Sequence, residues 1–511
     1  MQSKELSPAG IAASVPDDAV LVFTSDASLM VCDAIFAAIE KRFLETGHPR
    51  NLTLIQPCNG FLGVGTGIDR FMHQGLAATL ITSILPPNKD SQTHKLHDDG
   101  HLDLVLLPMG MLYSWLRENA AGRPGLITSV GTGTFVEESV GRQIRIGGRP
   151  RTLLDRVTID GQSYLHLKPL NVDIAFVRAT SADARANLSL ERAQLVLDPM
   201  AVALSGKCGK GRVYAQVERL VPEVQPAKEV AVPGIFIEGF CVVPDAAHSI
   251  YGGYDAALAN DEASPPDAVE QLDTVREVIL RRAIREIPDH AIVNLGVGMG
   301  AYVPGQMRMT ADAPLCTFVT EHGAVGGTPV GDVNLFGVHR NAEALINPSD
   351  MFAAYTGGLI DISILGFAQV DAAANVNVSR FSGRSNGPGG FIDISSNARK
   401  LIFCGTFTAG GLKVEAADGK LRILQEGKVR KFVEEVEEVT YSSQALKGTS
   451  NRLLFITERC VLEHHGGRWL LKDVTPGIRI EDDILALLPF DVAVADDCLS
   501  VRSPMLAAGV S

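Results

Sequence analysis

The sequence lacks the excess of basic residues that nucleic-acid binding requires. Lys and Arg number 46 against 59 Asp and Glu, so the formal net charge of the 511-residue chain is −13, and no basic run occurs. Proteins bind the phosphate backbone mainly through clustered Lys and Arg side chains. We therefore expect no nucleic-acid partner, and the apolar content of 46% is typical of a well-buried globular enzyme.

Long apolar runs are also missing. The longest uncharged stretches, such as residues 362–370, are far shorter than the roughly 20 residues that span a bilayer. The N-terminal segment has no basic start followed by an apolar core, so it does not resemble a signal peptide. We therefore expect no membrane partner and a cytoplasmic protein.

The 8 cysteines form no metal or redox motif. No Cys-x-x-Cys occurs, which argues against a zinc ribbon and against a dithiol redox centre. Buried, reduced thiols of a cytosolic protein are the expected state. The absence of Gly-x-Ser-x-Gly also argues against a serine hydrolase.

One histidine cluster has the spacing of metal ligands on a helix. His94, His97 and His101 follow one another at intervals of three and four residues, with two aspartates between them. Zinc would require the three rings to converge on one point. A mobile polar connection is the simpler interpretation, so we predict no metal site.

Short apolar runs alternate with helix-like segments along the chain. Residues 19–24 (AVLVFT) and 51–56 (NLTLIQ) have the pattern of buried strands. Residues 29–44 between them have apolar positions at helical spacing, with Ser25 or Asp26 as the expected N-cap. This rhythm predicts an α/β fold with largely parallel sheets.

An internal repeat indicates two similar halves. The segment from Asp173 to Asn187 matches the segment from Asp361 to Asn375 in length, and each begins as an apolar strand and ends in a polar turn. Ordered matches of this kind favour a duplicated α/β domain.

The junction of the two halves is also visible in the sequence. Residues 251–266 are small and polar and end in Pro-Pro, which is typical of a linker, and residues 267–286 then have a helical pattern. We predict one domain over residues 1–260 and a second over residues 261–511.

Three glycine clusters follow predicted strands or precede helices. They comprise residues 59–67 (NGFLGVGTG), 296–301 (GVGMGA) and 387–390 (GPGG). Glycines in such positions can expose backbone N–H groups to an anion or a carbonyl oxygen. An ordinary turn is the alternative interpretation for each cluster.

A fourth glycine cluster contains a carboxylate. Glu321 follows the apolar residues 315–320 and precedes Gly323, Gly326 and Gly327. Glycines at this point let a reactive ligand atom and polarising N–H groups reach the carboxylate without Cβ clashes. Glu321 is therefore a candidate catalytic residue, and a strand-end glutamate that caps a turn is the alternative.

A dinucleotide-binding interpretation competes with this one. Gly296, Gly298 and Ala301 fit a dinucleotide fingerprint, and Glu321 lies 25 residues past the first glycine, where a ribose-binding acid belongs. However, residues 302–314 contain two prolines and leave little room for the crossover helix. The nicotinamide hypothesis is therefore the weaker of the two.

Taken in order along the chain, these motifs resemble a known family. The whole chain, from about residue 15 to 495, is similar to the fused-subunit family I CoA-transferases, in particular the acetate/propionate CoA-transferase branch. The resemblance rests on residues 67–71 (GIDRF), 122–125 (GRPG), 131–135 (GTGTF), 321–327 (EHGAVGG), 375–381 (NVNVSRF), 389–395 (GGFIDIS), 403–411 (FCGTFTAGG) and 429–432 (VRKF). Two similar open α/β halves are the fold that this family implies.

The resemblance implies transfer of CoA between short-chain carboxylic acids by a ping-pong mechanism. Glu321 would be the nucleophile, and its carboxylate would pass through an acyl-glutamyl anhydride to a glutamyl-CoA thioester. The implied oxyanion donors are the Asn377 side chain and the N–H groups of Gly389 and Gly390, with Asn375 as the alternative asparagine. The glycines implied at the substrate and CoA site are Gly63, Gly65, Gly67, Gly296, Gly298, Gly323, Gly326 and Gly327.

The resemblance further implies that the enzyme needs no cofactor, since the CoA thioester is itself a substrate. The expected partners are acyl-CoA and small carboxylates, and the expected assembly is a homo-oligomer, either a dimer or a tetramer. An acyl-CoA hydrolase on the same scaffold is the alternative activity. An NAD-binding oxidoreductase or a metabolite sensor would also be compatible with glycine-rich segments in an α/β fold.

One stretch departs from the short-chain branch and leaves the physiological acid pair open. Residues 336–358 differ in composition from the corresponding segment of that branch. His339 and Arg340 lie in this stretch. They could contact the carboxylate of a polar acid, or they could simply lie on the surface.

Overall fold

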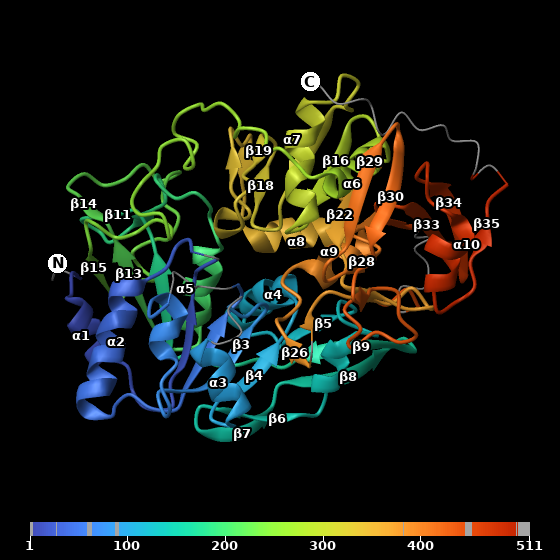
Figure 1. Ribbon diagram of the computed structural model, residues 1–511. Helices are drawn as coiled ribbons and strands as arrows, with labels where there is room; N and C mark the ends of the chain where they lie inside the picture. The colour runs from blue at the N-terminus through green and yellow to red at the C-terminus, as the bar shows by residue number, and fades with distance from the viewer. Residues whose placement is uncertain are drawn as a thin grey trace.

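Two sheets of mostly parallel strands, one in each half of the chain, form the frame of the molecule (Figure 1). The computed structural model describes residues 4–26, 28–58, 64–86, 91–381, 383–444, 452–496 and 498. The predicted α/β class with two similar halves is confirmed. None of the helices in these residues has the length and the apolar character that crossing a membrane requires.

The first sheet has seven strands, and every neighbouring pair is parallel. In sheet order they are β15 (Gly239–Val242), β13 (Arg212–Val217), β10 (Ile174–Arg178), β1 (Val20–Phe23), β2 (Leu52–Gln56), β3 (Ala77–Thr82) and β4 (Asp103–Leu106). Central parallel strands are covered on both faces, which is why β1 and β2 consist of consecutive buried residues. The predicted strands at residues 19–24 and 51–56 are confirmed.

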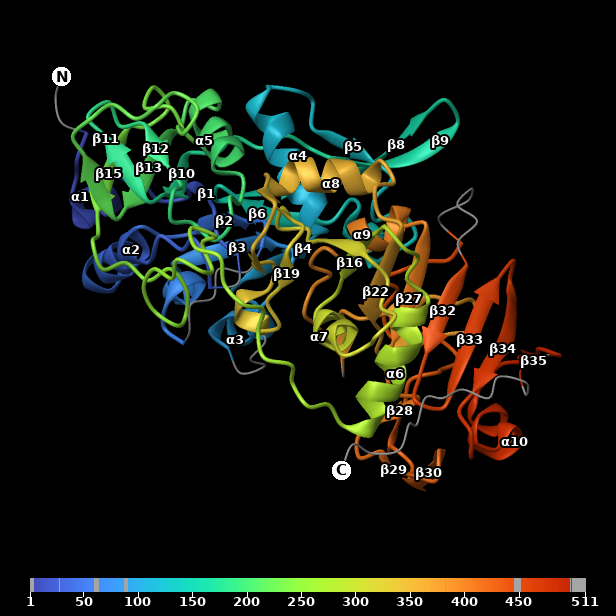
Figure 2. The same cartoon turned by 90° about the horizontal axis from the view of Figure 1, so that it is seen from above.

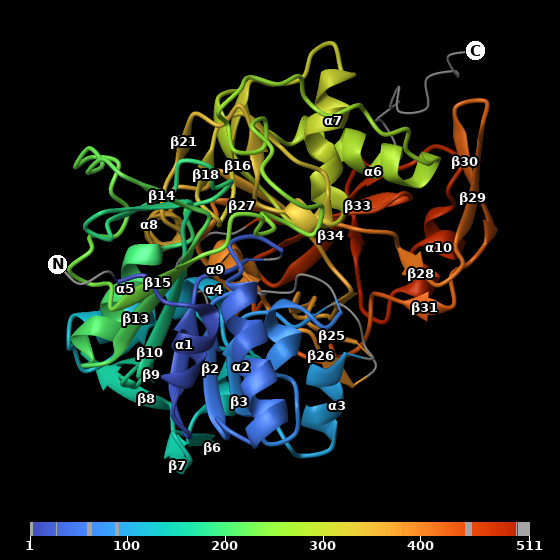
Figure 3. The ribbon, with the colours of Figure 1, turned by 90° about the vertical axis from the view of Figure 1, so that its left-hand side faces the viewer.

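Helices cover both faces of this sheet. On one face lie α1 (Pro8–Ala13) and α2 (Asp33–Thr46), which stand in front of the strands in Figure 3, and on the other lie α4 (Met109–Ala120) and α5 (Pro199–Cys208). The predicted N-cap of the first long helix is wrong. The backbones of Asp26 and Leu29 pair in a tight turn, and α2 begins only at Asp33 after Cys32.

Smaller antiparallel elements complete the first half. They are β5 (Leu126–Thr128), β6 (Gln143–Ile146), β7 (Arg149–Thr152), β8 (Leu154–Ile159), β9 (Gln162–Leu167), β11 (Ser181–Asp183), β12 (Leu188–Ser189) and β14 (Arg219–Val221), together with α3 (Gln92–Asp98). The helix α3 occupies the segment predicted to be a mobile connection, and Ser91 caps its N-terminus. That prediction is therefore wrong.

The second sheet has ten strands with a parallel centre. In sheet order they are β21 (Ala344–Leu345), β18 (Ala324–Val325), β17 (Cys316–Val319), β16 (Ala291–Leu295), β22 (Ile362–Gly366), β27 (Lys400–Cys404), β32 (Leu453–Ile456), β33 (Cys460–His465), β34 (Arg468–Val474) and β35 (Ala493–Val494). The five strands from β17 to β32 are parallel, and antiparallel strands extend the sheet on both sides.

Helices also cover both faces of the second sheet. One face carries α6 (Thr274–Arg285) and α7 (Val303–Arg308), and the other carries α8 (Pro348–Thr356) and α9 (Phe391–Asn397). The helix predicted over residues 267–286 begins later, because Asp273 accepts a hydrogen bond from the backbone N–H of Arg276 and caps it there.

Short hairpins and a final helix complete the second half. The hairpins pair β19 (Thr328–Pro329) with β20 (His339–Arg340), β23 (Gln369–Val370) with β24 (Val376–Asn377), β25 (Arg380–Phe381) with β26 (Arg384–Ser385), β28 (Thr408–Ala409) with β31 (Val429–Arg430), and β29 (Lys413–Ala417) with β30 (Lys420–Gln425). The helix is α10 (Ile480–Asp483).

The sequence repeat corresponds to a repeated hydrogen-bonded turn. In the first half the amide of Asn187 donates to Asp183 Oδ2 over 2.8 Å, and Asp183 Oδ1 accepts the backbone N–H of Asn187. In the second half the amide of Asn375 donates to Asp371 Oδ2 over 3.0 Å, and Asp371 Oδ1 accepts the backbone N–H of Asn375. Asn375 therefore fixes the turn between β23 and β24.

The two halves meet through their inner helices. In Figures 1 and 2, α4 of the first half lies against α8 and α9 of the second. Asp393 on α9 accepts a hydrogen bond from the backbone N–H of Gly110 over 3.0 Å, and Asp198 accepts one from Ser349 N over 2.6 Å. The boundary at residues 260 and 261 stays a prediction.

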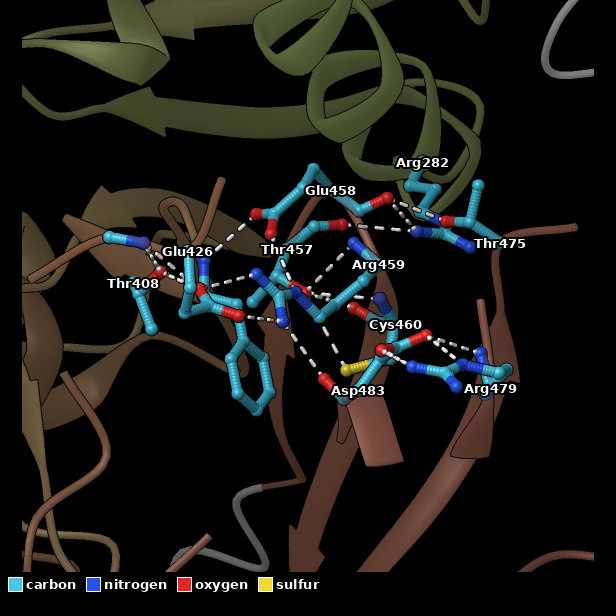
Figure 4. Close-up of polar contacts among 12 residues, drawn as sticks. Arg282, Thr408, Glu426, Thr457, Glu458, Arg459, Cys460, Thr475, Arg479 and Asp483 are labelled. Carbon is cyan, nitrogen blue, oxygen red and sulfur yellow. Dashed lines mark hydrogen bonds and ion pairs between the residues drawn. The ribbon is translucent and has the colours of Figure 1, made fainter. Parts of the chain in front are cut away.

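A buried arginine in the connection between β32 and β33 contacts two other segments of the second half (Figure 4). The side chain of Arg459 is fully buried and lies between two carboxylates: Nε donates to Glu458 over 2.8 Å, and both terminal nitrogens donate to Glu426 over 3.0 Å. Nη1 also donates to the carbonyl oxygen of Asp483 in α10. One guanidinium thus holds three separate segments together.

Replacing Arg459 by Met is expected to lower the free energy of unfolding by about 3–5 kcal/mol, because Glu458 then remains buried without its counter-charge. Arg479→Met is the matched control: Arg479 pairs with Asp482 and Asp483 in the same region but is largely exposed, so we expect an unchanged unfolding midpoint. Denaturant unfolding of the two variants gives the comparison. Equal midpoints would contradict a stabilising role for the buried contact.

Candidate active site

Glu321 lies just past the carboxyl end of β17, inside the protein. Its side chain is 5% exposed, and Oε2 accepts a hydrogen bond of 3.4 Å from Asn294. The chain reverses immediately after it, since Gly323 N donates to Thr320 O. Gly323 has a φ of +101° and packs so closely on the carbonyl of Ile346 that no Cβ would fit. The glutamate is thus fixed at the start of a tight turn.

Asn294 on the neighbouring strand β16 holds the glutamate in place. It is fully buried, and its amide nitrogen lies within hydrogen-bond distance of Val319 O, Glu321 Oε2 and Tyr355 Oη, at 3.3 to 3.4 Å. Its amide oxygen accepts from Ser363 Oγ over 3.1 Å. Our sequence analysis missed this residue, although a lone asparagine inside an apolar strand is the signal that could have found it.

Burial makes Glu321 an unusually weak acid. Loss of solvation raises its pKa to about 7. The hydrogen bond from Asn294 lowers the pKa, but by less than burial raises it. Burial raises the pKa of Asp393 to about 7 as well, and the negative charge of Glu321 adds to that rise. A carboxylate that titrates near neutral pH in an enclosed site is a typical catalytic group.

A cavity of about 830 Å³ lies between the two halves and reaches Glu321. The first half contributes Asp26, Ser28, Cys58, Ile84, Leu85 and Met109 to its wall. The second half contributes Gly296 and Val297 after β16, Glu321 and His322 after β17, residues 365–369 around the end of β22, residues 387–391 before α9, and Lys431. In the described part of this wall, Lys431 is the only Lys or Arg side chain. The other wall residues are mostly apolar.

Three polar side chains from different segments meet in the wall. Cys58 donates to Asp26 Oδ1, and His322 Nε2 lies against Asp26 Oδ2. Burial lowers the pKa of His322 to about 3, so the imidazole is neutral. Asp26, Cys58 and His322 form the one group of His, Cys, Asp and Glu among the described residues whose ligand atoms lie within 4.8 Å of one another. Our sequence analysis singled out none of them for this role.

The histidines with metal-ligand spacing do not form such a group. His94 is buried at the start of α3, and Nδ1 of His97 bonds the carbonyl oxygen of Leu102. His101 lies beyond the helix and is exposed. The expectation of buried thiols is wrong at Cys208, which is exposed at the end of α5.

The glycines before α9 adjoin Glu321. Gly389 and Gly390 both line the cavity. A Cβ placed on Gly390 would lie 3.3 Å from Cγ and Oε1 of Glu321, so glycine gives the carboxylate its space. The backbone N–H of Gly389 donates to Ser83 O over 2.9 Å and is therefore already engaged.

The other predicted glycines divide into two groups. Gly296 lines the cavity, whereas Gly298, Gly323, Gly326 and Gly327 lie outside its wall. A Cβ would overlap the carbonyl of Ile346 at Gly323, the side chain of Glu343 at Gly326 and the carbonyl of Arg340 at Gly327. These three glycines allow chain segments to approach one another.

The first glycine cluster is described only in part. Gly63 lies outside the described residues. Gly65 donates its N–H to Asp69 over 3.3 Å, and Gly67 donates its N–H to Asp33 over 2.7 Å. Neither of the two lines the cavity.

Asn377 is fully buried behind the cavity wall. Its amide nitrogen donates to Gln369 Oε1 over 2.8 Å and to Arg380 O over 2.7 Å. Gln369, but not Asn377, lines the cavity. The role of Asn377 as an oxyanion donor stays a prediction, and it would require the hydrogen bonds of Asn377 to rearrange.

His339 and Arg340 do not line the cavity. His339 is fully buried, its Nδ1 bonds Gly326 O over 2.6 Å, and burial lowers its pKa to about 4. Arg340 pairs with Asp267 over 2.7 Å. Both residues fasten the β19–β20 hairpin to its neighbours.

Comparison with known proteins places this geometry in a family. Residues 11–241 match the family described as "Coenzyme A transferase". The chain is 34% identical to the caffeate CoA-transferase of Acetobacterium woodii, over 93% of this chain and 92% of that protein. It is 31% identical to the acetate CoA-transferase YdiF of Escherichia coli (strain K12), over 94% of this chain and 91% of that protein.

A solved structure has the same overall arrangement. The acyl-CoA transferase YdiF from E. coli O157:H7, crystallised as a thioester complex with CoA, superposes with a TM-score of 0.85 at 30% identity, over 96% of this chain and 94% of that one. The likeness to YdiF and to the caffeate enzyme extends over nearly the full length of each chain. The chain therefore belongs to the coenzyme A transferase family and is a CoA-transferase.

Proposed function

We propose that the protein transfers CoA between short-chain carboxylic acids through a glutamyl-CoA thioester on Glu321. The observation that carries this proposal is the position of Glu321, a buried carboxylate with a raised pKa that faces an elongated cavity between the two halves. The relatives named above, which act on acetate and caffeate, and the CoA thioester of the YdiF structure support it. The cytoplasmic location and the homo-oligomer stay predictions.

The proposed reaction needs only one protein nucleophile. A carboxylate oxygen of Glu321 attacks the thioester carbonyl of the acyl-CoA, the C–S bond breaks, and an acyl-glutamyl anhydride and a CoA thiolate form. The thiolate then attacks the glutamyl carbonyl, and the first acid leaves as its carboxylate. A second carboxylate reverses both steps and departs as a CoA thioester, so one difficult exchange is divided into easier covalent steps.

The shape of the cavity supports a path for the pantetheine arm of CoA. Along the second sheet, the wall follows the carboxyl ends of β17, β16 and β22, two strand spacings or about 10 Å in all. Lys431 lies at the far end of this row, with Nζ 3.9 Å from the centre of the Phe367 ring, and burial lowers its pKa to about 8. There it can donate to a carbonyl oxygen of the arm.

The walls beside Glu321 favour transfer over hydrolysis. Met109, Leu365 and Phe391 line the cavity with apolar surface, which keeps water from the anhydride and the thioester. The N–H of Gly390 is our proposed donor to the developing oxyanion, because that of Gly389 is already bonded to Ser83.

Loss of the glutamate carboxylate should abolish the reaction. Glu321→Gln keeps the side-chain size but not the nucleophile, so we expect CoA transfer to fall by about 10³-fold or more. Incubation of the wild-type protein with acetyl-CoA, borohydride reduction and peptide mass spectrometry should locate a reduced side chain at position 321. Glu435→Gln, at an exposed glutamate, is the matched control. An active enzyme in which Glu321 remains unmodified would contradict the mechanism.

The pH profile should report the ionisation of Glu321. Only the ionised carboxylate attacks, and its pKa is raised to about 7, so kcat/KM for the acyl-CoA should fall about tenfold per pH unit below pH 7 and be level above it. A rate that does not change between pH 5 and 8 would argue against a buried nucleophile.

Filling the space beside the carboxylate should slow the reaction without unfolding the protein. In Gly390→Ala the added methyl group meets Glu321 at 3.3 Å, so we expect kcat to fall by about 10- to 100-fold through misplacement of the nucleophile. Gly253→Ala is the control, because its Cβ would point into open space. Equal activity of the two variants would show that the carboxylate tolerates a larger neighbour.

A further inference from the structure

The two carboxylate oxygens of Glu321 have different neighbours. Oε2 accepts the 3.4 Å hydrogen bond from the side-chain amide of Asn294, which is fully buried and does not line the cavity. Oε1 lies beside Gly390, since a Cβ added to that glycine would be 3.3 Å from this oxygen, and Gly390 does line the cavity. Oε2 is thus directed at the buried strand β16, and Oε1 at the cavity wall.

Contacts on both sides fix the orientation of the Asn294 amide. The carbonyl oxygen of Val319 and an ionised Glu321 can only accept hydrogen bonds, so the amide nitrogen has to face them. On the other side, Ser363 Oγ donates to the amide oxygen over 3.1 Å. An amide turned the other way would place its own oxygen against two acceptors. Asn294 therefore presents a donor, and not an acceptor, to Oε2.

The proposed reaction treats the two oxygens differently. The attacking oxygen bonds to the acyl carbon and becomes the bridge of the anhydride, while the other becomes the carbonyl oxygen on Cδ. When the thiolate attacks Cδ, the bond from Cδ to the bridging oxygen breaks, and the first acid leaves with that oxygen.

The second acid replaces the lost oxygen. One of its carboxylate oxygens bonds to Cδ of Glu321, and the C–S bond of the glutamyl thioester breaks. The thiolate then attacks the acyl carbon of the new anhydride, and the bond from that carbon to the bridging oxygen breaks. Each cycle thus exchanges one oxygen of the glutamate and leaves the other in place.

We propose that Asn294 is a positioning residue that gives the two oxygens of Glu321 separate fates: Oε1 attacks and is exchanged in every cycle, whereas Oε2 is retained. This inference rests on the proposed function, since it concerns the covalent steps on Glu321. Rotation of the carboxylate about its Cγ–Cδ bond would interchange the oxygens, and it would break the hydrogen bond to Asn294. Whenever Cδ becomes tetrahedral, the negative charge lies on Oε2, where the amide of Asn294 can donate to it.

Labelling with ¹⁸O counts the exchanged positions. Wild-type protein is incubated with acetyl-CoA and an excess of acetate that carries ¹⁸O at both oxygens, for about ten turnovers per active site. The ¹⁸O that enters acetyl-CoA counts the turnovers, and mass spectrometry then weighs the peptide that contains Glu321. We expect one ¹⁸O atom in this peptide.

The number of labels separates this inference from the proposed function. Two ¹⁸O atoms in the wild-type peptide would show that the carboxylate rotates between turnovers, so the inference would fail while the proposed function stands. An active enzyme whose peptide carries no ¹⁸O would overturn the proposed function, and the inference with it, because the glutamate would then exchange no oxygen.

Variants assign the retention to the amide of Asn294. Asn294→Ala removes the side-chain donor to Oε2, so the peptide should acquire two ¹⁸O atoms over the same number of turnovers. Ser363→Ala removes only the hydrogen bond that fixes the amide, and it should give a mixture of one and two labels. Unfolded protein takes up no label, so a loss of folding cannot imitate a second one. A single label in Asn294→Ala would overturn the role of the amide.

The matched control is Asn171→Ala, at an exposed asparagine outside the site. It should give one label, as in the wild type. The pH profile is a second readout: the bond from Asn294 lowers the pKa of Glu321, so Asn294→Ala should move the midpoint of kcat/KM to higher pH. On the alkaline plateau, kcat should fall by about 10²-fold, because the oxyanion on Oε2 loses a donor. An unchanged midpoint and plateau would overturn the inference.

Discussion

The burial of one carboxylate between two sheets is the constraint on which the rest of the site depends. Glu321 is held out of water, and its pKa rises to about 7 because the charged form loses solvation. A backbone hydrogen bond at Glu321 and the long hydrogen bond from Asn294 lower the pKa, but they offset only part of that cost. A fully solvated carboxylate would be a poorer nucleophile, and one held by several donors would be unreactive. The walls of the cavity therefore contribute to the reactivity of Glu321, because they exclude water from its carboxylate.

The duplicated architecture explains how such an enclosure forms. The parallel strands of the second half end at the cavity, where open α/β sheets generally bind ligands, and the first half presents its own strand ends from the other side. Asp26 follows β1 and Cys58 follows β2, so their positions relate to the first sheet as those of Gly296 and Glu321, which follow β16 and β17, relate to the second. The strand ends of the two halves thus line one cavity.

Local patterns in the sequence predicted most of the main strands and helices and the candidate glutamate, but not the contacts of the site. Glu321 could be found because a glutamate followed by three glycines has a distinct local signature. Asp393 and Asp26 have none, since each acquires its role only when distant segments meet, and Asn294 is marked only as a lone asparagine inside an apolar strand. Asp26 was predicted to be a helix cap because aspartate favours that position, but the turn at Leu29 delays the helix and leaves its side chain in the cavity.

The glycines after Glu321 show a second limit of local reasoning. A glycine indicates that something approaches the backbone closely, but not whether a ligand or another segment does so. At Gly390 the neighbour is the nucleophile itself, whereas at Gly323 and Gly327 it is the protein backbone. Only the folded structure shows whether a ligand or a protein segment approaches a glycine, because the neighbours of Gly323 and Gly327 are residues 346 and 340, which are not next to them in the sequence.

Contacts between the two halves reach the surroundings of Glu321 from two sides. Asp393 of the second half caps the start of α4 in the first, and burial together with the charge of Glu321 raises the pKa of Asp393. Asp26 of the first half contacts His322, the residue after Glu321. A change in the separation of the halves would therefore disturb both of these contacts, and with them the environment that sets the pKa of Glu321.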